Sequence, residues 1–157
     1  MRRSIILIAL ISAIIPIGAA DQPPTTQGCA LFRRFVISDE PNWTGQVVFH
    51  ASWNSNVRNS SKPDQKRCDY HGNHAGEAVC SYLIAHDTYD WARRSAGWAV
   101  ECVSSGTVFA PNIRIGAATF FIPYGTRTHG SDVVIIYNYE EYASGVSVDL
   151  ILEASPY

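Results

Sequence analysis

The sequence lacks the short motifs that mark many enzymes and nucleotide-binding proteins. It contains no phosphate-binding loop, no dinucleotide-binding glycine fingerprint, no EF-hand loop and no G-x-S-x-G nucleophile elbow. It also lacks internal repeats and any break in composition that would separate two domains. We therefore expect a single domain that requires no cofactor.

An excess of positive charge is absent as well. The chain has 12 Lys and Arg residues against 14 Asp and Glu residues, and removal of Arg2 and Arg3 with a signal peptide leaves 10 against 14, a net charge of −4. Nucleic-acid binding requires a basic patch. The one basic cluster, residues 62–67, contains Pro63 and Asp64 and predicts a solvated loop. Neither nucleic acid nor an anionic membrane surface is an expected partner.

Long apolar runs are absent except at the N-terminus. Arg2 and Arg3 precede an apolar run over residues 5–17, and Gly18-Ala19-Ala20 supplies the small residues of a cleavage site. This three-part pattern predicts a signal peptide over residues 1–20, and the run is shorter than the about 20 residues of a membrane span. An uncleaved anchor is the alternative. We expect a secreted or periplasmic protein with no stable membrane span after cleavage.

The mature chain divides into a short lead-in and one domain. Residues 21–28 contain Pro23 and Pro24 and predict a flexible lead-in. Residues 29–157 predict a single disulfide-stapled domain of α+β class. Its expected architecture is an antiparallel sheet of about five or six strands with one helix, straight or kinked, packed on one face.

The expected elements follow from hydrophobic periodicity. Residues 75–95 predict the helix, with Asn73 as its N-cap and a kink at Asp87, and residues 54–73 predict a long polar loop. The predicted strands are residues 30–37, 46–53, 98–104, 113–122, 133–141 and 146–154.

The last two predicted strands can be placed in register. A two-residue turn at Ser144-Gly145 would put Glu140 opposite Asp149, and two like charges facing each other are unfavourable. A turn over residues 142–145 instead pairs Glu140 with Ser147 and Asn138 with Asp149. We prefer this second register, and in either one the core face carries Ile135, Tyr137, Tyr139, Val148, Leu150 and Leu152.

Four cysteines in an exported chain predict two disulfides. If residues 98–104 form a strand antiparallel to the helix, Cys80 and Cys102 come level within about one helical turn. This argument predicts Cys80–Cys102 and, by elimination, Cys29–Cys68. It leaves no cysteine for catalysis.

Candidate catalytic residues are few, and each has a plain structural interpretation. His129 and Asp132, with Arg127 nearby, fall in a predicted loop, where polar residues are common without catalysis. Glu140 and Asp149 share a strand face and have the residue types of a glycosidase acid pair, or they form a solvated edge. We predict no catalytic site and keep these residues as the alternative.

A metal site is the weaker alternative. Cys68, His71 and His74 have C-x-x-H-x-x-H spacing, and thiolate and imidazole are good zinc ligands. However, the spacing matches no common zinc finger, and an exported Cys68 is expected to be oxidised. We predict no metal, with His71 and His74 as the residues that would bind one.

Aromatic residues suggest a recognition surface, because tyrosine is common at protein interfaces. The candidate binding residues are Tyr82, Tyr89, Tyr124, Arg127 and Tyr142. Filling of the core is the alternative interpretation for the tyrosines. Asn42 and Asn59 lie in glycosylation sequons, which have meaning only in a glycosylating host.

The small size, the disulfides and the missing catalytic motifs favour a non-enzymatic exported binding protein, such as an inhibitor or an immunity-type protein. Its expected partner is another protein. The two alternatives are a small secreted hydrolase with an acid or histidine site on a loop or strand face, and a structural envelope component.

Overall fold

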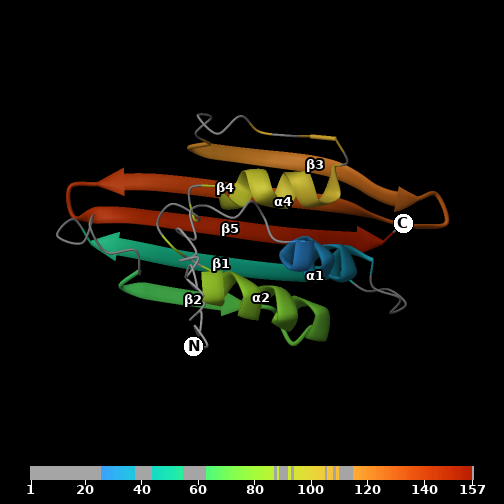
Figure 1. Cartoon of the computed structure of the whole chain (residues 1–157), viewed down its shortest axis with the longest axis horizontal. Coiled ribbons are helices and arrows are strands. Elements are labelled where there is room, and N and C mark those ends of the chain that lie inside the picture. The colour runs from blue at the N-terminus through green and yellow to red at the C-terminus, as the bar shows by residue number, and fades with distance from the viewer. Residues whose placement is uncertain are drawn as a thin grey trace, which may run out of the picture.

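The structure, a computed structural model, is an antiparallel sheet covered on one face by helices (Figure 1). It describes residues 26–37, 44–54, 63–86, 88, 92, 94–104, 106, 107, 109 and 115–156. Within these residues the elements are α1 (Thr26–Val36), β1 (Gly45–Asn54), β2 (Gln65–Asp69), α2 (His74–His86), α4 (Ser95–Val103), β3 (Ala117–Thr126), β4 (His129–Tyr142) and β5 (Gly145–Pro156).

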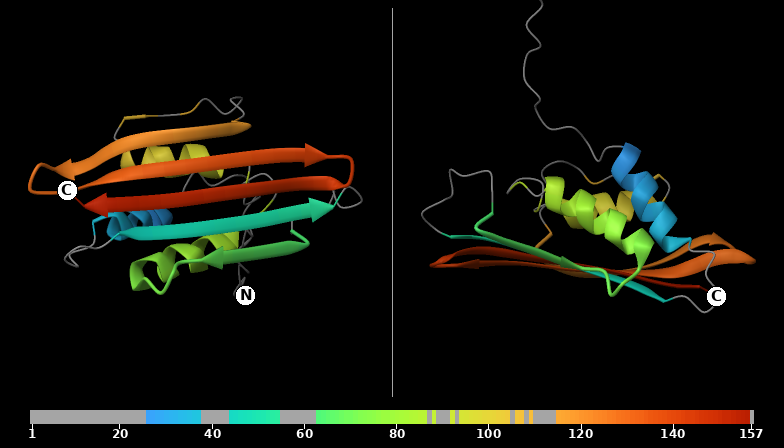
Figure 2. Two further views of the ribbon diagram at one scale, coloured as in Figure 1. Left: turned by 180° about the vertical axis from the view of Figure 1, so that it is seen from behind. Right: turned by 90° about the horizontal axis from the view of Figure 1, so that it is seen from below.

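The predicted α+β class is confirmed. Five strands form one sheet in the order β2-β1-β5-β4-β3, and every neighbouring pair runs antiparallel. The described helices α1, α2 and α4 all lie on the same side of the sheet, as the edge-on view in Figure 2 shows. The described residues therefore contain three helices where one was expected.

The predicted hairpin register is also confirmed. Glu140 pairs with Ser147, and Asn138 pairs with Asp149. The pairing continues to Tyr142 and Gly145, so only two residues connect β4 to β5.

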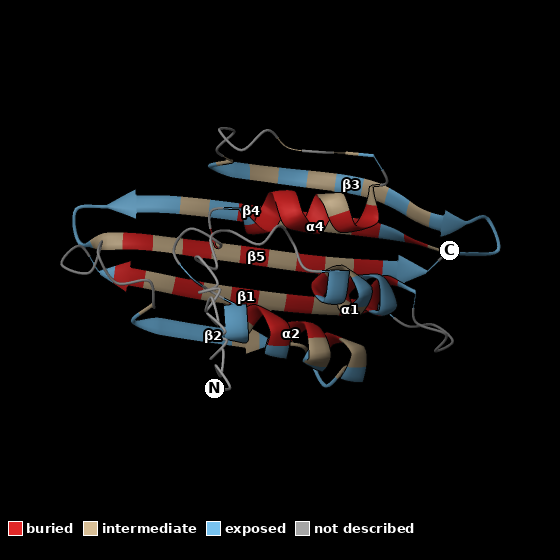
Figure 3. Ribbon diagram, viewed as in Figure 1, coloured by how far each residue is buried: buried red, intermediate tan, exposed pale blue. Residues whose placement is uncertain are grey.

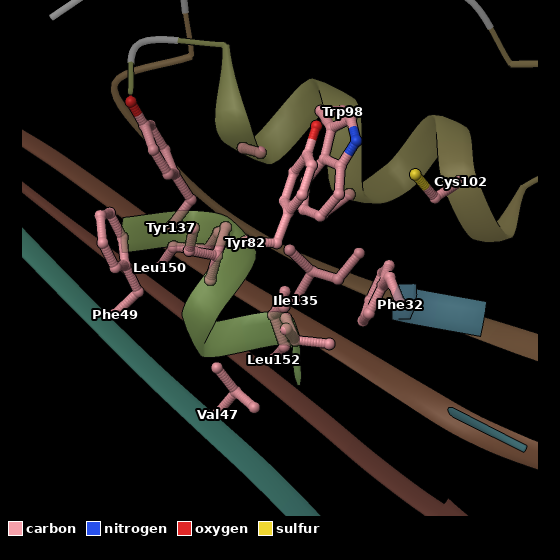
Figure 4. Close-up of a cluster of buried hydrophobic side chains, with 14 of the residues drawn as sticks. Phe32, Val47, Phe49, Tyr82, Trp98, Cys102, Ile135, Tyr137, Leu150 and Leu152 are labelled. Atoms are coloured by element: carbon pink, nitrogen blue, oxygen red, sulfur yellow. The ribbon is translucent and has the colours of Figure 1, made fainter. Parts of the chain in front are cut away.

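The core lies between the helices and one face of the sheet. Burial alternates strictly along β1 and β5, with every second side chain buried (Figure 3). In Figure 4 the aromatic rings of Phe32, Tyr82 and Trp98 come from three different helices and gather above the sheet. The predicted core face of β4 and β5 is correct, since Ile135, Tyr137, Val148, Leu150 and Leu152 are fully buried and Tyr139 packs against them.

The predicted strand over residues 30–37 is wrong, because this segment belongs to helix α1. Its buried residues are Phe32, Phe35 and Val36, at the i, i+3, i+4 spacing of one helix face. Arg33 and Arg34 lie in the last turn, where positive charge interacts favourably with the helix dipole. Since α1 begins at Thr26, the end of the predicted lead-in is also helical.

The predicted strand over residues 98–104 is wrong as well. Ser95–Val103 forms helix α4, which contains Gly97. Eight of the nine residues of α4 are buried. A helix that is buried on nearly all sides has no polar face, so its sequence does not show the alternation of apolar and polar residues that identifies a surface helix.

The predicted disulfide pairing is wrong. The bridges are Cys29–Cys102, which links α1 to α4, and Cys68–Cys80, which links β2 to α2. Cys80 and Cys102 were expected to come level because residues 98–104 were predicted as a strand, but Cys102 lies in helix α4.

The segment between β1 and α2 contains strand β2, where a long loop was expected. The predicted N-cap is correct, since the side-chain oxygen of Asn73 accepts a hydrogen bond from the backbone N–H of Gly76 at 2.7 Å. Asp87, the predicted kink, lies outside the described residues, as do the signal peptide and the sequon residues Asn42 and Asn59. None of the described helices has the length and apolar character needed to span a membrane.

Candidate functional site

The face of the sheet turned away from the helices is covered by no described element (Figure 2). We call it the open face. Its centre is apolar: Val48, Ile151 and Ile136 are neighbours in one cross-strand row, and Val134 and Phe121 are neighbours in the next. We call these five residues the apolar band. It crosses four strands, and strand alternation places it on the side opposite the core.

Exposed aromatic side chains concentrate on this face. Among the described residues the exposed large hydrophobic side chains are Phe121 at 76%, Tyr142 at 52% and Ile37 at 40%. Phe121 belongs to the apolar band. Tyr142 lies at the hairpin end of β4, where strand alternation places it on the open face. Two of the three most exposed hydrophobic side chains therefore lie on the open face, and Tyr142 was a predicted binding residue.

A row of polar side chains runs across the open face beside the apolar band. The row consists of Arg67, His50, Asp149 and Asn138 on β2, β1, β5 and β4. The Nδ1 atom of His50 lies 2.7 Å from Oδ1 of Asp149, and their side chains are 22% and 41% exposed. A carboxylate at Nδ1 favours the tautomer protonated there and leaves Nε2 as the acceptor. We call these four residues the polar row.

The charge on the open face has one dominant sign. Arg67 is the basic strand residue on this face. Five carboxylates share the face with it: Asp69, Asp132, Glu140, Asp149 and Glu153. Glu153 accepts a hydrogen bond from the side-chain amide of Gln46 at 2.7 Å, and Asp132 and Glu140 are exposed. The apolar band thus lies within an acidic surround.

The structure separates His129 from Asp132. Ser131, between them, is buried on the core side, so strand alternation places His129 on the core side and Asp132 on the open face. His129 contacts Thr128 through Nδ1 at 3.1 Å, and Arg127 is exposed in the turn before it. These residues do not form one site.

Glu140 and Asp149, in contrast, share the open face. They are diagonal neighbours on β4 and β5, because Glu140 pairs with Ser147 and Asp149 pairs with Asn138. Diagonal neighbours lie about 7–8 Å apart. Asp149 is hydrogen-bonded to His50. Glu140 therefore lies beside a carboxylate–imidazole pair, whereas a glycosidase acid pair would require two carboxyl groups that both face the substrate.

The predicted binding tyrosines differ in position. Tyr82 is 5% exposed and stacks on Trp98 at 5.7 Å, so it belongs to the core rather than to a surface. Tyr124 pairs with Ser131 on the core side of the sheet and packs against the core. Tyr89 lies outside the described residues.

The candidate metal ligands are held in other contacts. The Nδ1 atom of His71 lies 3.8 Å from Oδ1 of Asp69, and the Nδ1 atom of His74 lies 3.6 Å from Oε2 of Glu77. Cys68 is oxidised to a disulfide. No group of three His, Cys, Asp or Glu residues that could hold a metal ion is found among the described residues.

Sequence reasoning missed two prominent open-face residues, His50 and Phe121. Alternation over residues 46–53 already placed His50 on the face opposite the core residues of β1. The signal was therefore present, but the pairing of His50 with Asp149 requires knowledge that β1 lies beside β5. Phe121 lies on β3 directly opposite Val134 and was not among the predicted binding residues.

Comparisons with known proteins assign no relative. No protein-family model matches the sequence, and neither the curated proteins nor the solved structures contain a significant match.

Proposed function

We propose that this chain is a small exported, non-enzymatic binding protein of the inhibitor or immunity type, and that its open face binds another protein. The observation that carries the proposal is the uncovered sheet face with exposed Phe121 beside the apolar band. Contiguous exposed apolar surface on a small domain commonly marks an interaction site.

The size of the open face supports this proposal. Five strands spaced about 4.8 Å apart give a width of about 24 Å, and ten residues at about 3.3 Å each give a length of about 33 Å. The product is about 800 Å², which equals the area that one partner contributes to a standard protein interface.

The arrangement of residues supports it as well. Binding energy in protein interfaces concentrates in a few aromatic and apolar residues, which are surrounded by a polar rim. The apolar band and Phe121 supply such a centre, and the polar row supplies one side of such a rim. Export is supported by two disulfides, which persist mainly in oxidising compartments.

The test is capture of the partner from the native secretome by immobilised mature protein, with two matched variants. Phe121→Ser removes the most exposed aromatic side chain of the open face. Ile37→Ser removes an exposed hydrophobic side chain from the residue that follows α1 and serves as the control. We expect a partner that wild type and Ile37→Ser retain, that Phe121→Ser loses, and whose own activity falls when the protein is added.

The proposal fails if the captured proteins are the same for all three forms. It also fails if the partner binds in a Phe121-dependent manner but keeps its full activity, because an inhibitor must reduce that activity. Circular dichroism of each variant shows that a lost interaction is not a lost fold.

A secreted hydrolase is the second candidate, and the His50–Asp149 pair favours it. An imidazole oriented by a carboxylate can act as a general base toward water or a substrate hydroxyl, and Glu140 lies in the next row on the same face. If wild type turns over any member of an ester and glycoside panel, and His50→Gln lowers kcat about a hundredfold while His129→Gln does not, the hydrolase replaces the inhibitor.

A further inference from the structure

The open face and the helix side of the molecule differ in charge. The open-face strand residues carry five carboxylates and one guanidinium, whereas the described helix residues carry nearly balanced charge. On the helices and the cap of α4 these charges are Arg33, Arg34 and Arg94 against Glu77 and Glu101. Among the described residues, the excess of negative charge therefore lies on the face that carries the apolar band.

The positions of the carboxylates matter as much as their number. Asp132 and Glu140 lie near opposite ends of β4, and Glu153 lies directly beside Val134 of the apolar band. Asp69 lies on the edge strand β2, directly opposite Val48 of the band. The carboxylates thus stand around the apolar band on several sides, as charges do in the rim of an interface.

This arrangement argues against a second copy of the chain as the occupant. Two open faces packed together would bring two sets of five carboxylates into one contact, with a single arginine on each side. Like charges facing each other across an interface cost several kcal/mol and suppress that pairing.

We infer that the partner presents a cationic protein surface, with Lys and Arg side chains around an apolar centre that covers Phe121. This inference rests on the proposed binding role of the open face and adds the chemistry of the partner to it. The apolar centre buries the band, while the Lys and Arg side chains pair with the surrounding carboxylates. Opposite charges also speed association, and this steering weakens as salt is added.

The test uses a random twelve-residue peptide library displayed on phage, selected against immobilised mature protein. We expect enriched peptides with an excess of Lys and Arg and at least one aromatic or aliphatic residue. Synthetic versions of these peptides should bind Phe121→Ser at least tenfold more weakly than wild type and Ile37→Ser.

Matched charge variants test the rim directly. Glu140→Gln removes an exposed open-face carboxylate, and Glu77→Gln removes an exposed carboxylate from α2 as the control. An exposed ion pair accounts for about a two- to fivefold change in affinity. We expect that loss for Glu140→Gln, a larger one for Asp132→Asn/Glu140→Gln, and no change for Glu77→Gln.

The outcomes separate this inference from the proposed function. If acidic or uncharged peptides are enriched and still require Phe121, the cationic partner is ruled out while the open face remains the binding surface. If no peptide is enriched, or if binding is the same for Phe121→Ser and wild type, the proposed function fails too. A dimer in light scattering that Phe121→Ser dissociates would identify a second copy as the occupant and overturn the inference.

Discussion

Individual residues show how the helix layer is fixed to the sheet. Ser131 is 2% exposed, and its hydroxyl donates a hydrogen bond to the backbone carbonyl of Val36. Val36 is the last residue of α1, where carbonyl groups lack partners within the helix. A single buried hydroxyl of β4 therefore satisfies one of the terminal carbonyl groups of α1.

Replacement of Ser131 tests this contact. Ser131→Ala leaves the Val36 carbonyl buried without its donor, and such a loss costs about 1–3 kcal/mol. We expect the free energy of unfolding in urea, measured with the disulfides intact, to fall by that amount. Ser155→Ala, at an exposed position of β5, should change it by less than about 0.5 kcal/mol. Equal effects of the two variants would contradict this role of Ser131.

The His50–Asp149 contact shows what a sequence can supply at the scale of residues. The alternation of β1 put His50 on the right face, and the hairpin register put Asp149 opposite Asn138 correctly. Their contact spans 99 residues of sequence. No local sequence pattern indicates which strand lies beside β1. His50 and Asp149 could therefore be placed on their own strands, but their contact could not be predicted.

At the scale of elements, the strands β1, β4 and β5 were predictable, whereas β2 and two of the helices were not. The strands β1, β4 and β5 alternate because one face is buried and the other is open, and period-two alternation has no helical counterpart. Helix α4 is buried on nearly all sides, so its sequence shows no contrast between an apolar face and a polar face. Helix α1 is short and rich in aromatic and branched residues, which are also common in strands.

The packing of α1 against α2 depends on a glycine. A Cβ atom built on Gly28 would overlap the ring of Tyr82, which is buried beneath α1 and stacks on Trp98. The absence of a side chain at position 28 therefore permits the close approach of the two helices.

Gly28→Ala tests this approach. We expect a loss of about 1–3 kcal/mol in the free energy of unfolding, since overpacking a core costs this much, even though alanine favours helix formation. Gly116→Ala is the control, because a Cβ atom at Gly116 meets nothing within 4 Å. If Gly28→Ala is as stable as wild type in thermal unfolding, the ring of Tyr82 does not limit the approach of α1.

At the scale of the whole molecule, the disulfides tie distant parts of the chain together. Cys29–Cys102 spans 73 residues and Cys68–Cys80 spans 12 residues. Because the loss of chain entropy on closing a loop grows with loop length, we expect about 4 kcal/mol from the first bridge and about 3 kcal/mol from the second.

Removal of each bridge in turn checks this order. Cys29→Ser/Cys102→Ser should lower the midpoint of urea unfolding more than Cys68→Ser/Cys80→Ser does. Peptide mapping of the unreduced protein should yield a Cys68–Cys80 peptide. A peptide that joins Cys80 to Cys102 would contradict the helix assignment of α4 together with the pairing.

In the molecule as a whole, the two faces of the sheet differ in what covers them. Three described helices and two disulfides consolidate one face, and the other face remains open with an apolar band within an acidic surround. A rigid, uncovered sheet of this size is suited to binding a protein surface, because little has to be ordered when the partner binds.

The most direct measurement is oxidative footprinting of the complex with the captured partner, read by mass spectrometry at three side chains. Phe121, Tyr142 and Ile37 are the exposed large hydrophobic side chains among the described residues, so each should be modified in the free protein. The account predicts that the partner protects Phe121 and Tyr142 and leaves Ile37 reactive. Protection of Ile37, with Phe121 and Tyr142 still modified as in the free protein, would contradict it.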